Sequence, residues 1–255
     1  MKKYTLFGIC LLLIVSQVIF AEVKVQDILI KMDDLQKLSE DVTAKVVMVQ
    51  KDVEQGTKVM ECIYFAQDAN DLFLIVMTKP ESEKGNGYLK SGSNFWMYRR
   101  NTRTFQHINR DESIAGTDAN AGDFESPQYE KQYQGKKDAS GKDIIEKTKL
   151  GKIPVYKVEI DAKLPDVDYP KKILWVRQDN FLPLKEQSYS LSGSLMYSQY
   201  YLKYTKKKDK FIPIKQLVVD EFEKGNKTLL KLSGIALEPI NDDIFTKAYL
   251  ENLSK

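Results

Sequence analysis

Apolar residues near the start of the chain recur every three or four positions. They form one stripe, made of Val25, Ile28, Leu29, Met32, Leu35 and Leu38. This spacing predicts an amphipathic helix over about residues 25–39, and Asp27 in its first turn suits the positive end of the helix dipole. A helix this short is not stable in isolation, so its stripe is expected to pack against another part of the protein.

From residue 42 onwards the period changes to two, which is typical of strands. Apolar and polar residues largely alternate over residues 42–48 and 60–64, and turn residues such as Gln55 and Gly56 separate these runs. Further strand-like runs cover residues 72–77, 87–89, 94–99, 104–108, 144–150, 155–161, 172–177, 183–189, 196–204, 212–222 and 227–237. Because short turns join most neighbouring runs, the pattern predicts a meander of hairpins and therefore an antiparallel sheet.

Two segments depart from the strand pattern. Residues 109–142 are rich in glycine and polar residues, with short helical turns expected at Ser113–Ala115 and Tyr129–Tyr133. Long irregular stretches inside a compact domain are usually functional or mobile. A final helix is predicted from Asn241 or Asp242, which would cap it. Its apolar face would consist of Ile244, Phe245, Ala248, Tyr249 and Leu253.

The order of elements predicts an α+β domain that is mainly antiparallel β. A sheet of this many strands must curl or split rather than stay flat. Periodicity alone is compatible with a closed barrel, a half-barrel and a sandwich. The two apolar-striped helices favour a curled sheet with helices on its concave side.

Residues 1–21 have the three parts of a secretion signal. Lys2 and Lys3 precede an apolar run over residues 6–20, and Ala21 provides a small residue before the cut. The alternative is a membrane anchor, although the run is shorter than the roughly 20 residues that span a bilayer. Cleavage would leave residues 22–255 as a single domain, and loss of the two lysines would lower the net charge from +3 to +1. We therefore expect an exported, periplasmic protein without a nucleic-acid partner.

Signatures of catalysis and metal binding are scarce. His107 is the only histidine, and no G-x-S-x-G nucleophile motif occurs. A single histidine and a single cysteine after residue 21 argue against a zinc site. Residues 118–123 loosely resemble a calcium-binding loop, but the rest of that pattern is absent. We expect no enzymatic activity, no metal and no cofactor.

Aromatic residues gather in residues 95–98 and again in residues 197–204. Core packing and cross-strand pairs account for such groups, and so does the wall of a cavity that holds an acyl chain. Strand parity predicts one apolar concave surface, made of Val46, Met48, Met60, Cys62, Tyr64, Leu74, Met196 and Tyr200. Trp96 and Tyr98 share a face and are also predicted to point into the cavity. Parity leaves open which face of each strand is concave.

Residues 84–108 resemble a known family. They contain a K-G-x-G-Y-L turn over Lys84–Leu89, a W-x-Y strand over Trp96–Tyr98, and a T-R-x-x-x-x-I run over Thr102–Ile108. With these motifs the chain resembles the outer-membrane lipoprotein-sorting protein family, the LolA/LolB-like periplasmic lipoprotein carriers, in its spirochaete LolA-like branch. Two departures stand out, because Arg100 replaces the usual proline and the phenylalanine of S-x-x-G-[ST]-D-F is delayed to Phe124. The resemblance otherwise extends over nearly all of residues 22–255.

The resemblance implies an unclosed, curved antiparallel β-barrel, a half-barrel with helices over its open side. It implies an apolar interior that shelters the acyl chains of a lipoprotein or lipid, with an inner-membrane ABC transporter permease as donor. The function expected from it is that of a monomeric periplasmic carrier. The alternative is an accessory subunit of an ABC transporter that carries no lipid, and a hydrolase with an unrecognised site is a third reading.

The segment over residues 109–142 is predicted to be a lid. It follows the W-x-Y hairpin and carries Ile114, Phe124, Tyr129 and Tyr133 among glycines, which permit hinge changes. We expect it to cover the open side of the barrel and to move when cargo enters. A surface insertion with no role in binding is the alternative.

Overall fold

The computed structural model describes residues 23–165 and 167–253. The predicted secretion signal at residues 1–21 lies outside this part of the chain. Within it, no helix is both long enough and apolar enough to cross a membrane.

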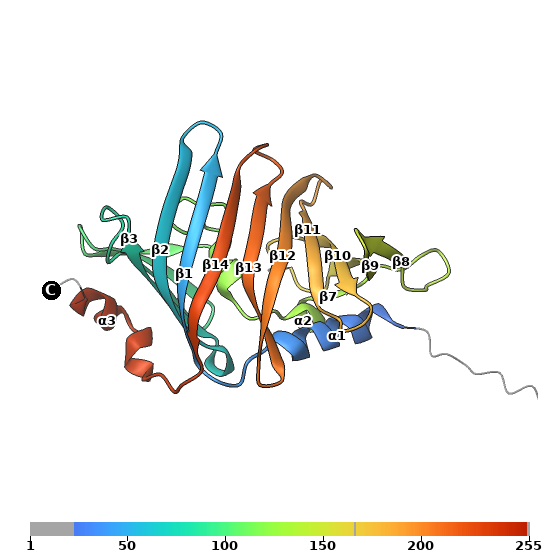
Figure 1. The fold of residues 1–255 in the computed structure, drawn as a ribbon, viewed down its shortest axis with the longest axis horizontal. Helices are drawn as coiled ribbons and strands as arrows, with labels where there is room; N and C mark the ends of the chain where they lie inside the picture. The colour runs from blue at the N-terminus through green and yellow to red at the C-terminus, as the bar shows by residue number, and fades with distance from the viewer. Residues whose placement is uncertain (1–22, 166, 254–255) are drawn as a thin grey trace, which may run out of the picture.

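The described residues form one antiparallel sheet of fourteen strands (Figure 1). The strands are β1 (Val42–Asp52), β2 (Gly56–Gln67), β3 (Leu72–Lys79), β4 (Gly87–Ser91), β5 (Asn94–Arg99), β6 (Thr104–Ile108), β7 (Tyr133–Gly135), β8 (Ile145–Leu150), β9 (Ile153–Ala162), β10 (Lys171–Arg177), β11 (Pro183–Tyr189), β12 (Leu195–Lys207), β13 (Lys210–Asp220) and β14 (Lys227–Ala236). Their spatial order runs from β6 back to β1, then from β14 back to β9 and on to β7, while β8 also pairs with β9. The curved sheet does not close on itself, so the predicted half-barrel is confirmed.

Two meanders meet where β1 pairs with β14. Val46 of β1 lies opposite Cys62 of β2 on one side and Leu232 of β14 on the other. Apolar side chains therefore line up across three strands on the same face. A slip of one residue would turn every one of these side chains to the other face, so the hydrophobic alternation fixes the register.

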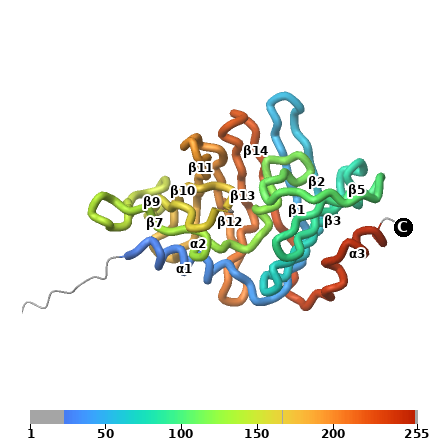
Figure 2. The backbone as a smooth tube through the Cα atoms, turned by 180° about the vertical axis from the view of Figure 1, so that it is seen from behind, coloured from blue at the N-terminus to red at the C-terminus, as the bar shows by residue number. Residues whose placement is uncertain are grey.

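The first helix, α1 (Val25–Gln36), packs as its stripe predicts. Ile28, Leu29 and Met32 are fully buried in one cluster with residues of β9 and β10. The Val25 amide donates a hydrogen bond to Asp143 Oδ2 at 2.8 Å, which satisfies one of the free amide groups at the helix start. We call the face of the sheet that α1 covers the inner face; it is the hollow side of the curve (Figure 2).

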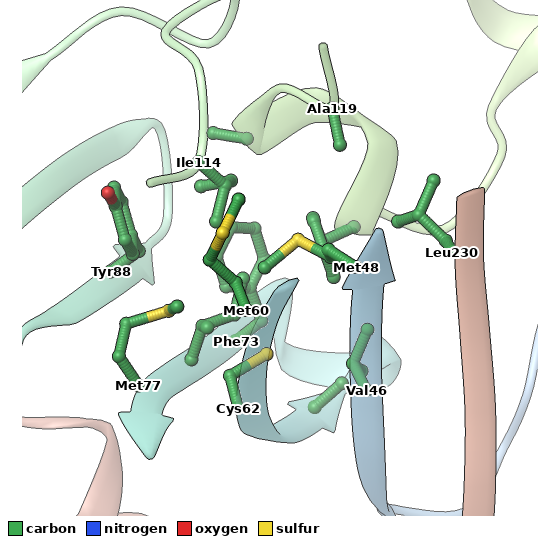
Figure 3. Packing of buried hydrophobic residues seen from close by; sticks show 14 of the residues in the cluster. Val46, Met48, Met60, Cys62, Phe73, Met77, Tyr88, Ile114, Ala119 and Leu230 are labelled. Carbon is green, nitrogen blue, oxygen red and sulfur yellow. The ribbon is translucent and has the colours of Figure 1, made fainter. Parts of the chain in front are cut away.

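The mid-chain segment, residues 109–142, also lies on the inner face (Figure 2). It contains a 3₁₀ turn, η2 (Ala121–Phe124), the short helix α2 (Tyr129–Gln132) and strand β7. Ile114 and Ala119 pack on side chains of β1, β2 and β3 (Figure 3). The Ala115 amide donates to the Tyr88 hydroxyl at 2.8 Å. The segment is thus an ordered layer of the domain, with α2 at the place where a short helical turn was predicted.

The C-terminal elements cover the opposite, outer face. Leu74 and Ile75 are successive residues of β3 and pair with Phe65 and Tyr64 of β2. Successive side chains of a strand point to opposite faces, so Leu74 and Ile75 lie on different faces of the sheet. Leu74 and Tyr98 are buried beneath Phe245 and Leu250. The expectation of helices on the concave side therefore holds for α1, whereas α3 (Lys247–Asn252) packs on the outer face.

The predicted apolar face of the final helix is confirmed for Ile244, Phe245 and Tyr249, which pack in the outer cluster, and is wrong for Ala248 and Leu253, which are exposed. The 3₁₀ turn η3 (Asp242–Phe245) and α3 are separated by Thr246, whose backbone is extended with φ −127° and ψ 152°. This break resets the helical phase. As a result Leu250 is buried, while Ala248 is exposed.

Candidate functional site

A cavity of about 210 Å³ lies between the inner face of the sheet and the mid-chain segment. One half of its wall is apolar. It is made of Leu38, Val42, Phe124, Ile212, Pro213, Val218, Leu230 and Leu232, which come from the α1–β1 connection, β1, β13, β14 and η2. On β14, residues 230 and 232 face the cavity because they share strand parity. The Tyr64 hydroxyl donates to the Phe124 carbonyl at 2.7 Å and holds η2 against the sheet.

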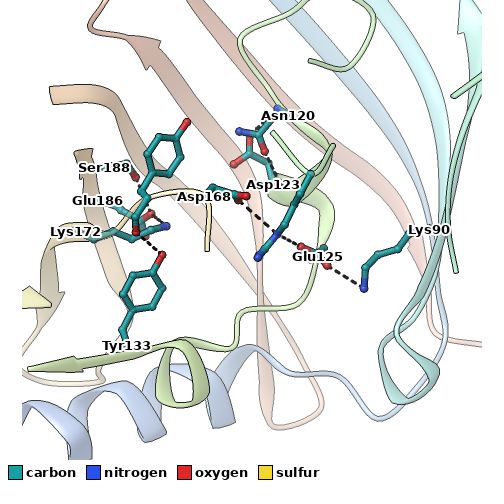
Figure 4. A network of polar contacts seen from close by, with 11 residues as sticks. Lys90, Asn120, Asp123, Glu125, Tyr133, Asp168, Lys172, Glu186 and Ser188 are labelled. Atoms are coloured by element: carbon teal, nitrogen blue, oxygen red, sulfur yellow. Dashed lines mark hydrogen bonds and ion pairs between the residues drawn. The ribbon is translucent and has the colours of Figure 1, made fainter. Parts of the chain in front are cut away.

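The other half of the wall is polar and contains a buried ion pair. Lys172 of β10 contacts Glu186 of β11 at 2.5 Å, and their side chains are only 16% and 5% exposed (Figure 4). Burial alone lowers the pKa of Lys172, but Glu186, Tyr133 and Asp168 together outweigh burial and keep the pKa above its usual range. The Tyr129 hydroxyl donates to the other oxygen of Glu186. Burial, and then the same carboxylate, raise the pKa of Tyr129 well above its ordinary value.

A chain of ion pairs runs from Lys90 through Glu125 and Arg110 to Asp168, and the last three of these residues line the cavity (Figure 4). Lys90 of β4, whose side chain is 4% exposed, contacts Glu125 at 2.9 Å. Glu125 also pairs with Arg110, and the Arg110 Nε lies 3.5 Å from Asp168. Although burial by itself lowers the pKa of Arg110, Glu125 and Asp168 raise it overall. These ion pairs link the mid-chain segment to strand β4 and to the connection between β9 and β10.

Asp123 lies at the polar end of the cavity, in the first turn of η2. Its Oδ2 accepts a hydrogen bond from the Asn120 amide at 2.9 Å, and Asn120 Oδ1 accepts one from the Asp123 amide at 3.0 Å. This reciprocal pair is a capping box. Burial raises the pKa of Asp123 to about 6. The capping box accounts for the spacing that loosely resembles a calcium loop, and no group of three potential metal ligands occurs among residues 23–165 and 167–253.

Part of the predicted site lies at or beside this cavity. Tyr64, Phe124 and Tyr129 line it. Val46, Met48, Met60 and Cys62 lie in the adjoining core, in one cluster with Ile114 (Figure 3). Tyr133 is buried in the neighbouring cluster with α1. Burial raises the pKa of the Cys62 thiol to about 12, which is the behaviour of a packed side chain rather than a reactive one.

The remaining predicted residues do not share that surface. Leu74, Trp96 and Tyr98 belong to the outer cluster, and the Lys247 amine lies 3.1 Å from the centre of the Trp96 ring. The predicted inward orientation of Trp96 and Tyr98 is therefore wrong, and so is the shared surface of Leu74 with Met60. The physical reason is that strand parity groups residues correctly but carries no information on which face is hollow.

Met196 and Tyr200 of β12 also face outward. They alternate with Tyr197, Gln199 and Tyr201, which line the cavity. Tyr200 lies opposite Lys185 of β11, whose amine is 5.3 Å from the centre of the Tyr200 ring. The expectation that Met196 and Tyr200 belong to the concave surface is therefore wrong, because the residues next to them along β12 face the cavity instead.

Comparisons with known proteins support the fold. LolA superfamily protein NE2245 from Nitrosomonas europaea superimposes with a TM-score of 0.75 at 22% identity, over 89% of this chain and 100% of that one. A putative outer membrane lipoprotein-sorting protein domain from Vibrio parahaemolyticus gives a TM-score of 0.75 at 19% identity, over 89% and 97%. A DUF1329 family protein from Desulfovibrio piger gives 0.74 at 19% identity, over 88% and 97%. These similarities establish that the chain has the LolA-like fold.

Sequence comparison is less specific. A family model described as "Uncharacterized protein" matches residues 69–252. The search of curated proteins gave no match.

Proposed function

We propose that the protein is a periplasmic carrier of acyl chains. The chain belongs to the family whose model matches residues 69–252, and it has the LolA-like fold. Its cargo is a lipoprotein or lipid, received from an inner-membrane ABC transporter permease and passed to an acceptor. The observation that carries this proposal is the apolar half of the cavity on the inner face, enclosed by a segment that is not part of the main sheet.

The energetics of an acyl chain fit such a site. Exposure of an acyl chain of about sixteen carbons to water costs roughly 0.8 kcal/mol of free energy for each methylene, or about 12 kcal/mol in all. Leu230, Leu232 and Val218 offer apolar surface that offsets part of this cost. The polar half of the wall limits the apolar contact, which keeps the complex weak enough for delivery.

The size of the cavity supports the lid proposal. At about 210 Å³ it is smaller than the roughly 300 Å³ at the lower end of ordinary ligand pockets. An acyl chain therefore enters only if part of the wall moves. The mid-chain segment is the candidate for this movement, because its residues Phe124 and Tyr129 form part of the cavity wall. Few hydrogen bonds join residues 109–124 to the sheet, and one of them runs from the Asp118 amide to Thr228 Oγ1 at 3.0 Å.

Hydrogen exchange tests this movement. Backbone amides within the segment are expected to exchange by local opening in the free protein. One example is the Ile114 amide, which donates a hydrogen bond to the Ala119 carbonyl at 2.8 Å. Binding of a lipid-modified peptide is expected to increase their protection. Edge strand β8 serves as the internal control, since it lines no part of the cavity. Exchange in residues 109–142 that ignores the ligand would rule the lid out.

Filling the apolar half tests the carrier function itself. Leu232→Trp places a larger side chain in the cavity, and Lys231→Trp places the same side chain on the opposite face of β14. Native mass spectrometry of protein purified from its host is expected to show lipid-sized mass on the parent and on Lys231→Trp, and at least about tenfold less on Leu232→Trp. Equal occupancy of both variants would contradict the assigned cavity. A parent protein without lipid would favour the transporter accessory subunit instead.

A further inference from the structure

The charges around the cavity do not balance. Its lining contains two cationic side chains, Arg110 and Lys172, and five carboxylates. Both cations are already engaged, Lys172 with Glu186 and Arg110 with Glu125 and Asp168. The polar half therefore presents more negative than positive charge to a bound molecule.

Asp123 is one of two carboxylates of the lining that form no ion pair, and the other is Asp68. No ion pair joins it to any residue of the described chain, and its hydrogen-bond acceptance from protein is limited to the Asn120 amide on Oδ2. Asp68, the other unpaired acid of the lining, instead accepts bonds from the Leu38 amide and the Ser126 side chain. A partly buried carboxylate without an ion-pair partner is unfavourable, so a ligand that supplies a cation gains binding energy there.

The protein itself shows how an ammonium is held in this cavity. The Lys172 amine contacts Glu186 and lies 5.5–5.9 Å from the ring centres of Tyr129, Tyr133 and Tyr169. A carboxylate combined with aromatic faces is a general arrangement for binding organic cations. The side chain of Lys172 thus serves as an internal example of the ligand group.

The same cavity contains a second combination of a carboxylate and aromatic rings. Tyr169 and Tyr197 form an edge-to-face pair with ring centres 5.8 Å apart, and both line the cavity with Asp123. Burial is the main cause that raises the pKa of both tyrosines, so their hydroxyls stay neutral and leave Asp123 as the charged group beside them in the cavity lining. We propose that Asp123, Tyr169 and Tyr197 form the headgroup site for an ammonium-bearing amphiphile whose acyl chain occupies the apolar half of the cavity. This inference rests on the proposed carrier function and specifies its ligand class.

An anionic headgroup fits less well. A phosphate would have to displace Glu186 from Lys172, or Glu125 and Asp168 from Arg110, and would then lie beside uncompensated carboxylates. An ammonium needs no existing ion pair to break. The distinction decides which class of amphiphile the cavity prefers, since the apolar half does not discriminate between headgroups.

Single-chain amphiphiles of equal length separate the headgroup from the chain. The probes are dodecylamine, dodecyl phosphate and uncharged dodecylglycerol, titrated calorimetrically below their micelle concentrations into lipid-free full-length protein at neutral pH. We expect dodecylamine to bind at least about tenfold more tightly than dodecyl phosphate, which corresponds to about 1.4 kcal/mol. Dodecylglycerol should lie between the two.

Two variants test the assigned residues. Asp123→Asn keeps an acceptor for the Asn120 amide and removes the charge, so it is expected to abolish the preference for dodecylamine over dodecyl phosphate. Asp111→Asn makes the same charge change at an exposed residue outside the cavity lining and should preserve the preference. Tyr197→Leu should weaken dodecylamine binding about threefold through loss of the aromatic face, and Tyr197→Phe should retain it.

Each outcome distinguishes the headgroup proposal from the carrier function. Equal binding of all three probes would overturn the ammonium site and leave the carrier intact. Tightest binding of dodecyl phosphate, strengthened further in Asp123→Asn, would show an anionic headgroup site and overturn the proposal. No binding of any probe, dodecylglycerol included, would refute the carrier function on which the proposal rests.

Discussion

Replacing Glu186 with leucine is expected to lower the free energy of unfolding by about 3–5 kcal/mol. The substitution leaves the Lys172 amine buried without its carboxylate and removes the acceptor of the Tyr129 hydroxyl. Loss of one partner of a buried ion pair strongly destabilises the folded protein, because the remaining charge keeps its desolvation cost without a compensating attraction. Urea denaturation followed by circular dichroism measures the change.

The double variant Lys172→Met with Glu186→Leu is the matched control. It removes both charges and replaces them with apolar side chains of similar size, so we expect it to recover most of the loss. Coupling between the two sites follows from the double-mutant cycle. A Glu186→Leu variant within about 1 kcal/mol of the parent would show that Lys172 reaches solvent or another acid, contrary to its 16% side-chain exposure.

This pair also bears on function. A protein in which apolar residues replace a buried ion pair is often no less stable than the original. Stability alone therefore does not account for a buried lysine and glutamate in the cavity wall. Together with Tyr129 they keep one half of the wall polar, next to Val218 and the other apolar residues. An amphipathic cavity matches an amphipathic ligand, which a uniformly apolar interior would not distinguish from a bare hydrocarbon.

Local patterns were sufficient to predict most of the elements. The alternation around Val46 and Cys62 predicts strands whose side chains line up on one face, and the structure pairs these two residues directly. The helical stripe of α1 predicts its buried face. Both predictions depend on periods of 2 and 3.6 residues, which the chain displays without reference to distant contacts.

The hollow face could not be predicted in this way. A period of two is symmetrical, so Leu74 and Ile75 are equally suitable for either side of β3. The choice depends on what each face packs against, namely the mid-chain segment inside and Leu250 outside. Those contacts join residues far apart in sequence, and the irregular backbone of residues 109–128 offers no period from which to infer them.

The polar residues of the site were missed for a related reason. A charged residue in a strand is ordinarily assigned to the solvent side, so alternation alone does not predict that Lys172 and Glu186 line the cavity. A usable signal exists, because Lys172 shares strand parity with Leu174 and Val176, which are fully buried. For the final helix, Thr246 carries a comparable signal, since its hydroxyl accepts the Tyr249 amide and marks a new helix start.

The second large effect concerns the pH dependence of stability at Asp123. Burial raises its pKa from 3.8 to about 6, while Glu186 and Asp168 raise it and Lys172 lowers it to lesser extents. Between about pH 4 and pH 6 the folded protein retains a proton that the unfolded chain has released, so stability falls as the pH rises through this window. Above it the ionised carboxylate destabilises the fold by about 3 kcal/mol, from the shift of the pKa at 1.36 kcal/mol per unit.

Asp123→Asn is therefore expected to be nearly neutral at pH 4 and to stabilise the ligand-free protein by up to about 3 kcal/mol at pH 7.5. Denaturation midpoints of parent and variant across this range measure the difference directly. Asp179→Asn is the control of opposite sign, because a hydrogen bond from Arg177 lowers the pKa of Asp179 and its contribution is lost as the pH falls. A constant difference between parent and Asp123→Asn from pH 4 to pH 7.5 would mean that the Asp123 carboxylate is well solvated. It would then have no need of a ligand cation. A difference that grows with pH, and that shrinks when dodecylamine is added to the parent, would mean that the ammonium supplies the missing counter-ion.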